Sequence, residues 1–160
     1  MVEDKKSVGA LVRLRDILDL YGTGHLATEL AAEDVASPIF SLPGNTKVRS
    51  ALEQMFQKRY RRVFIRGSDR FVWDRGIIKR LFSPEALAAA AQNPSRDFLR
   101  TPLSDFEMLE AGETKPRMAL EDAALQLKSG LGECLVFNGK VVTPWDVVMK
   151  PWKSKALKIK

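Results

Sequence analysis

The chain has 160 residues, a mass of 18.0 kDa and a net charge of +6, with 45% hydrophobic and 29% charged residues. This composition is typical of a soluble globular domain, and the single cysteine, Cys134, excludes an internal disulfide framework and an all-cysteine metal site. No stretch is apolar for long enough to span a membrane, and the first residues, MVEDKK, precede no apolar signal-peptide core, so we expect a cytoplasmic protein.

Residues 1–31 form a predicted N-terminal helical segment. The stretch ALVRLRDIL (10–18) and its flank place apolar residues at the spacing of an amphipathic helix: Val8, Leu11, Leu14, Ile17 and Leu18. We expect this helix to cover the first of two repeats that follow. His25, the only histidine, has no cysteine near it in the sequence, so no metal site is expected.

An internal repeat organises the rest of the chain. Residues 44–55 read GNTKVRSALEQM and residues 112–123 read GETKPRMALEDA, so the two copies are offset by 68 positions. Each copy predicts a turn, a threonine N-cap and an amphipathic helix. The predicted apolar faces are Val48, Ala51, Leu52 and Met55 in the first helix, and Ala119, Leu120, Ala123 and Ala124 in the second.

Each predicted helix is followed by two short strands and another helix. The strands read RRVFI and FVW in the first copy and ECLVF and KVV in the second, with glycine turns between them, and Cys134 is expected to be buried in its strand. Each unit therefore predicts strand, helix, strand, strand, helix, over residues 32–83 and 103–150. Ser83 and Pro84 are a helix-start signal, so residues 84–102 predict a helical connector. Residues 151–160 form a basic tail that we expect to be solvated.

The second unit ends in VVTPWDVV, residues 141–148. Thr143 has the position of an N-cap, Pro144 fits only the first turn of a helix, and Asp146 falls three residues after the cap. This spacing is that of a capping box, which explains these residues without any ligand.

The paired units resemble a tandem pair of CBS domains, named for cystathionine β-synthase. The resemblance rests on the repeated β-α-β-β-α order, on DVASP at residues 34–38 and on VVTPWD, which matches the family's pattern of two hydrophobic residues, Thr or Ser, two variable residues and Asp. It implies an α+β fold in which two units pack about a pseudo-twofold axis.

The resemblance also implies a function and a set of site residues. Such pairs bind adenosine-containing ligands (AMP, ADP, ATP or S-adenosylmethionine) as regulatory ligands rather than catalytic cofactors. By this matching, Asp146 would accept hydrogen bonds from the ribose hydroxyls and Thr143 would contact phosphate, beside Val142. Arg61 or Arg62 of the first unit would reach the phosphates. A carboxylate suits two hydroxyl donors, and a hydroxyl at a helix N-terminus suits an anion.

The first unit departs from this pattern. The stretch FVWDRG aligns Trp73 with Thr143 and Gly76 with Asp146, and neither residue can accept the hydrogen bonds required. We therefore expect one nucleotide site per chain. ALVRLRDIL carries a third, partial match, with Asp16 in place of the acid and Arg13 in place of the threonine, so a remnant of a third unit is an alternative to a simple covering helix.

Two other functions stay open. The basic stretch KRYRR and the lysine-rich tail are compatible with a nucleic-acid-binding module. If the protein's own side chains fill the ligand clefts between the two units, the pair would be a purely structural interaction module. No constellation for catalysis or metal binding is present in the sequence, so we expect no enzyme. The resemblance also predicts a homodimer, for which the N-terminal helix could supply the contact, and an unidentified protein partner that receives the signal.

Overall fold

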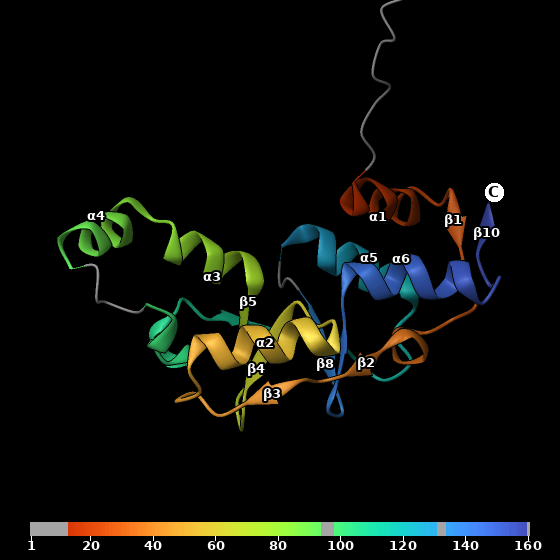
Figure 1. Cartoon of the computed structure of the whole chain (residues 1–160). Helices are drawn as coiled ribbons and strands as arrows, with labels where there is room; N and C mark the ends of the chain where they lie inside the picture. The colour runs from red at the N-terminus through yellow and green to blue at the C-terminus, as the bar shows by residue number, and fades with distance from the viewer. Residues whose placement is uncertain (1–12, 94–97, 131–133, 160) are drawn as a thin grey trace, which may run out of the picture.

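The structure is a computed structural model that describes residues 13–93, 98–130 and 134–159 (Figure 1). The first unit comprises η1 (Ala32–Val35), β2 (Ser37–Pro38), β3 (Ser41–Leu42), α2 (Val48–Lys58), β4 (Arg62–Ile65), β5 (Arg70–Trp73) and α3 (Asp74–Leu81). The second comprises η3 (Leu103–Asp105), β6 (Leu109–Glu110), β7 (Gly112–Glu113), α5 (Leu120–Ser129), β8 (Leu135–Phe137), β9 (Lys140–Val142) and α6 (Pro144–Lys153). The predicted α+β class and the order of elements in both units are confirmed.

The connector and the chain ends add smaller elements. The connector holds α4 (Pro84–Gln92) and η2 (Phe98–Arg100), and α4 begins as predicted, because the Ser83 side chain accepts a hydrogen bond from the Ala86 N–H. The ends supply α1 (Leu14–Gly22), β1 (Leu26–Ala27) and β10 (Lys158–Ile159), and β1 pairs with β10. The basic tail is therefore tied back to the chain through a short strand, although both residues of that strand are exposed.

The two units exchange strands. In the first sheet β3 runs parallel to β4, β5 returns antiparallel, and β6 of the second unit adds to β5; in the other sheet β7, β8 and β9 repeat this order and β2 of the first unit adds to β9. The segment that leads into each unit therefore divides between both sheets. A shared core of Phe64, Phe71, Cys134 and Val141 joins them, which confirms that Cys134 is buried.

The backbone pairing of the two units is reciprocal. Lys47 of the first unit bridges to Pro102, which leads into the second, and Ala119 of the second unit bridges to Ala31, which leads into the first. This reciprocity is what a pseudo-twofold arrangement requires, and it places the starts of α2 and α5 in equivalent positions.

The structural repeat has a different register from the visible sequence repeat. The N-caps of α2 and α5 are Lys47 and Ala119, which lie 72 residues apart (119 minus 47) rather than 68. The predicted threonine caps are wrong, because neither helix has a side-chain cap. Gly112 belongs to β7, whereas Gly44 follows β3, so the second unit starts its helix about one turn later.

A shift of four residues keeps the apolar spacing of a helix almost unchanged. The buried residues are Val48, Ala51 and Met55 in α2, and Leu120, Ala123, Ala124 and Leu127 in α5. Leu52 is half-buried and Ala119, expected on the buried face, is exposed. The helices were therefore correctly predicted as amphipathic, while their alignment was not.

The N-terminal helix packs against the second unit, not the first as expected. Figure 1 shows α1 lying over α5 and α6, and its buried residues Leu18 and Tyr21 join the core of the second unit. One contact on this unit involves Pro151 inside α6, which has no N–H to donate to the Val147 carbonyl. The Tyr21 hydroxyl donates to that carbonyl instead, at 3.2 Å. Val8 and Leu11 lie outside the described residues.

Candidate functional site

The start of α6 forms the capping box that the sequence predicts. The Asp146 N–H donates to Thr143 Oγ1 at 3.3 Å, and the Thr143 N–H donates to Asp146 Oδ2 at 3.0 Å. The Thr143 hydroxyl also donates to Asp146 Oδ2, at 2.7 Å, and Pro144 occupies the first helical position. Thr143 and Asp146 are thus brought together by the local helix start alone.

The second oxygen of Asp146 reaches across to the first unit. The Ser37 hydroxyl, on β2, donates to Asp146 Oδ1 at 2.7 Å, and the Lys150 ammonium lies 3.3 Å from the same oxygen. Asp146 is only 5% exposed. Its negative charge is balanced by the Lys150 ammonium, one turn along the same helix. We call Ser37, Thr143, Asp146 and Lys150 the Asp146 cluster.

Lys150 ties this cluster to the segment that leads into the first unit. Its ammonium donates to the carbonyls of Val35 and Ala36 at 2.6 and 3.1 Å, and to the Ser37 hydroxyl at 2.9 Å. Lys150 and Ser37 were not among the site residues predicted from the sequence. Lys150 could have been noticed from its spacing, because residues four apart share a helix face. Ser37 could not, because its contact depends on β2 pairing with β9.

The other predicted site residues, Val142, Arg61 and Arg62, make contacts outside the Asp146 cluster. Val142 is fully buried at the end of β9 and fills the core of the second unit. Arg61 is largely exposed, and its Nε donates to Asp74 Oδ2 at 2.7 Å. Arg62 begins β4, with its guanidinium 6.0 Å from the centre of the Phe71 ring. Both arginines therefore engage partners within the first unit.

The equivalent helix start in the first unit is filled by an aromatic ring. Trp73 is the N-cap of α3, as Thr143 is of α6, so Gly76 takes the position of Asp146. A Cβ added at Gly76 would lie 2.5 Å from the Cδ1 and Nε1 atoms of Trp73. The indole thus occupies the space where α6 carries its carboxylate. Asp74 faces Arg61 instead, so this end of α3 has no free acceptor of that kind among the described contacts.

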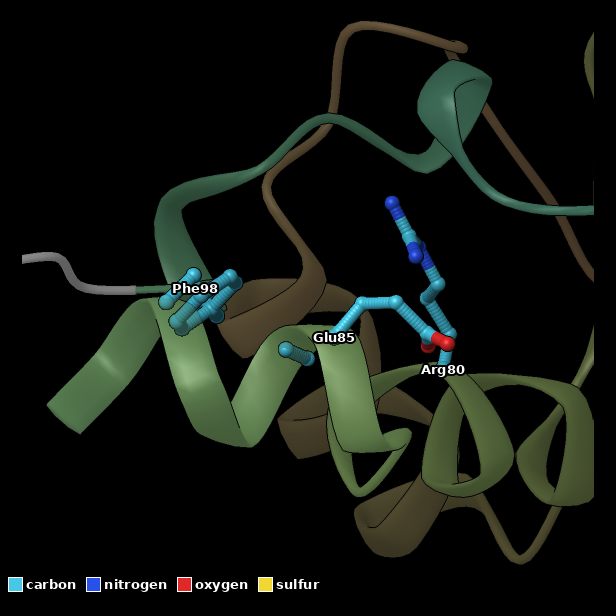
Figure 2. A pocket seen from close by; sticks show the side chains of 5 residues that line it. Arg80, Glu85 and Phe98 are labelled. Atoms are coloured by element: carbon cyan, nitrogen blue, oxygen red, sulfur yellow. The ribbon is translucent and has the colours of Figure 1, made fainter. Parts of the chain in front are cut away.

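A hollow elsewhere on the surface has a different character. It has a volume of about 210 Å³ and is lined by Arg80, Glu85, Ala86, Ala89 and Phe98, none of which the sequence analysis singled out. Figure 2 shows Phe98 and Arg80 on opposite sides of it, with Glu85 between them. The pKa of Glu85 is lowered by hydrogen bonds from its own backbone N–H and from the Ser83 hydroxyl, so this carboxylate serves the start of α4.

Neither a metal centre nor a membrane helix is found in the described part of the chain. Within residues 13–93, 98–130 and 134–159, no three His, Cys, Asp or Glu residues gather as metal ligands would. Over the same ranges no helix has the length and apolar character needed to cross a membrane.

The comparisons with known proteins identify the fold through solved structures. No family model and no curated protein matches the chain. Protein MJ1225 from Methanocaldococcus jannaschii, described as an archaeal homologue of g-AMPK, aligns with a TM-score of 0.70 and 15% identity. The alignment covers 90% of this chain and 55% of that one, so the chain spans about half the length of MJ1225.

Two further structures carry CBS domains by name. A hexameric CBS-CP12 protein from bloom-forming cyanobacteria aligns with a TM-score of 0.57 and 16% identity, over 76% of this chain and 67% of that one. CBSX2, solved in complex with AMP, aligns with a TM-score of 0.52 and 20% identity, over 78% and 98%. Together with the strand exchange and the two β-α-β-β-α units described above, these similarities show that the chain has the fold of a tandem CBS-domain pair.

Proposed function

We propose that the chain is a regulatory module that binds one adenosine-containing nucleotide at the Asp146 cluster. The observation that carries this proposal is the buried carboxylate of Asp146, held at a helix N-terminus and in contact with both units. The AMP complex of CBSX2, which has the same fold, supports an adenine nucleotide as the ligand class. AMP, ADP, ATP and S-adenosylmethionine remain candidates.

The cluster suggests how the nucleotide would be held. Both oxygens of Asp146 already accept hydrogen bonds from the chain, so ribose hydroxyls would have to replace existing donors. Ser37 and Lys150 are the donors most easily exchanged, because Thr143 is fixed by the capping box. The N–H groups at the start of α6, the Thr143 hydroxyl and the Lys150 ammonium would then face the phosphate.

Val142, Arg61 and Arg62 have secondary roles in this proposal. Val142 is fully buried and would act only by holding Thr143 in place from the core. Arg61 would have to leave Asp74 to reach a phosphate, whereas Arg62 is held against Phe71. We keep both arginines as candidate phosphate contacts.

The same contacts suggest how binding would be transmitted. Ser37 and the carbonyls of Val35 and Ala36 belong to the first unit, while Asp146 and Lys150 belong to α6. Exchange of these bonds for bonds to a ribose would change how the leading segment of the first unit is tied to the second. The output would be a change in the relative position of the two units, read by a partner protein.

A homodimer and a cytoplasmic location belong to the same proposal. The inner face of α1 is buried on its own second unit, so a second copy would meet its outer face, where Leu20 is exposed. Sedimentation velocity would measure the dimer.

The ion pairs of the basic segments do not support the nucleic-acid alternative. Arg61 of the KRYRR stretch pairs with Asp74, and Lys158 of the tail pairs with Glu29.

A ligand screen tests the proposed function. Isothermal titration calorimetry with AMP, ADP, ATP, S-adenosylmethionine and a short RNA should detect one of the adenosine ligands, at one site per chain. At about 100 times its Kd this ligand should stabilise the folded state by about 2.7 kcal/mol. Absence of binding by every adenosine ligand at millimolar concentration, or two equivalent sites per chain, would contradict the proposal.

A further inference from the structure

The Lys150 ammonium occupies the place that the proposed function assigns to a ribose. It lies 3.3 Å from Asp146 Oδ1 and donates to the Ser37 hydroxyl at 2.9 Å. It also donates to the carbonyls of Val35 and Ala36, at 2.6 and 3.1 Å. Because an ammonium has three protons to donate, these four oxygens satisfy it fully. The acceptors on this side of the Asp146 cluster are therefore taken up by a side chain of the protein itself.

The first unit shows the same place without these bonds. The last helices of the two units start 70 residues apart (143 minus 73), so Arg80 is the counterpart of Lys150. The segments that lead into the units are offset by 71 residues (102 minus 31, from the N-caps of η1 and η3), so Phe106 is the counterpart of Val35. Arg80 and Phe106 line a hollow of about 190 Å³, and within the described part of the chain Arg80 donates no hydrogen bond to that leading segment. This comparison indicates that the bonds of Lys150 close the equivalent place in the second unit.

Lys150 is also free to move. Its side chain is 37% exposed, whereas that of Asp146 is 7% exposed, so the ammonium can leave the cluster without unpacking the core. Long side chains of a helix point back toward its N-terminus, and the four-carbon stem of a lysine is flexible. The ammonium already lies beside Oδ1 of Asp146, and Oδ2 of the same carboxylate accepts a hydrogen bond from the Thr143 hydroxyl at the helix start. A short movement would therefore bring the ammonium to a phosphate bound at that helix start.

We propose that Lys150 gates the Asp146 cluster and makes it selective for a phosphorylated nucleoside over the nucleoside itself. This inference rests on the proposed function and names the residue that sets its specificity. A ribose that takes Asp146 Oδ1 breaks the ion pair and leaves the ammonium without a counter-ion, which is costly next to a buried carboxylate. A phosphate on the same ligand offers the ammonium a new anionic partner, whereas adenosine offers none.

Calorimetry with matched ligands and variants tests the gate. Wild type, Lys150→Met and Lys153→Met are titrated with adenosine and with whichever of AMP, ADP and ATP binds most tightly in the screen. Lys150→Met keeps a long unbranched side chain but removes the ammonium. Lys153→Met is the control, because it removes the same charge from an exposed position on the same helix. Melting temperatures check that both variants fold.

The two ligands should respond differently to the loss of the ammonium. Lys150→Met should bind adenosine about tenfold or more tightly than wild type does, because binding no longer breaks a hydrogen bond to a charged group. Its affinity for the phosphorylated ligand should rise less, because the contact with phosphate is lost as well. The preference for phosphate should therefore fall by about tenfold or more in Lys150→Met and stay unchanged in Lys153→Met.

Hydrogen exchange tests the same contacts with no ligand added. The bonds from Lys150 to the carbonyls of Val35 and Ala36 hold the segment that leads into the first unit. Backbone amides of residues 32–40 should therefore exchange faster in Lys150→Met than in wild type or Lys153→Met.

Several results would overturn the gate while leaving the proposed function in place. Adenosine binding that is unchanged or weaker in Lys150→Met would show that Lys150 does not oppose the ribose. Unchanged exchange over residues 32–40 would show that it does not hold the leading segment. A screen in which S-adenosylmethionine binds and no phosphorylated ligand does would contradict the selectivity. If no adenosine ligand binds wild type or Lys150→Met, the proposed function itself fails, and the gate fails with it.

Discussion

At the scale of single residues, Asp146 has two roles that use the same atoms. Oδ2 completes the capping box with Thr143, and Oδ1 meets Ser37 and Lys150 across the boundary between the units. The capping role was predictable from the spacing of Thr143 and Asp146 in the sequence. The second role was not, because it depends on β2 lying beside β9, a pairing between residues more than 100 positions apart.

The first prediction concerns the stability that Asp146 provides. Asp146→Ala removes the cap, which is worth about 1 kcal/mol. It also leaves the Ser37 hydroxyl without its acceptor and the Lys150 ammonium without its counter-ion, which adds a cost of about 1–3 kcal/mol. We therefore expect a total loss of about 2–4 kcal/mol in urea unfolding. In the Lys150→Met protein the same Asp146→Ala substitution should cost less, because no ammonium is left without its counter-ion. An equal cost in both backgrounds would show that the ion pair contributes nothing.

At the scale of elements, the sequence predicted which helices form better than it predicted which unit each helix packs against. Amphipathic spacing predicted α1, α2 and α5, because a helix turn repeats every 3.6 residues whatever it packs against. That same periodicity hid the four-residue shift between the repeats, and it could not tell which unit α1 covers. One contact that holds α1 on the second unit, from Tyr21 to the carbonyl freed by Pro151, joins elements at opposite ends of the chain.

The second prediction tests this contact by a double-mutant cycle. Tyr21→Phe should destabilise the protein by about 1–3 kcal/mol, because the Val147 carbonyl is then buried without a donor. Pro151→Ala restores an N–H that can bond to the same carbonyl within α6. Tyr21→Phe should therefore cost less in the Pro151→Ala protein, as measured by urea unfolding. Strict additivity of the two changes would rule out a shared acceptor.

The third prediction follows from the ionisation of Tyr21. Burial, and secondarily the charge of Glu121, raise the pKa of the Tyr21 hydroxyl from 10.0 to about 12. Between these values the unfolded chain loses this proton while the folded chain keeps it, so stability is full below pH 10 and falls as the pH rises toward 12. The free energy of unfolding should fall less steeply over this range in Tyr21→Phe. Identical slopes in both proteins would contradict this account.

At the scale of the whole molecule, the two units share a fold but differ at the start of the last helix and in how the helix pair is covered. The second unit keeps a buried carboxylate at its last helix and covers its helix pair with α1, whereas the first fills the equivalent helix start with Trp73 and leaves Phe56 and Ile78 exposed. The difference at the helix start was readable from Trp73 and Gly76 in the sequence. The difference in covering was not, because it depends on the packing of α1.

The central claim is that Asp146 receives the ribose of an adenine nucleotide, and a calorimetric double cycle tests it most directly. Wild type and Asp146→Asn, both checked for folding by their melting temperatures, are titrated with the nucleotide found in the screen and with its 2′,3′-dideoxy form. If Asp146 holds the ribose, the substitution should weaken binding of the normal nucleotide by about 1.5–3 kcal/mol, the range for a hydrogen bond to a charged group, or about tenfold to a hundredfold. It should weaken binding of the dideoxy form little further, because the hydroxyls are already gone. Equal losses for both ligands would contradict the claim and show that Asp146 does not contact the ribose.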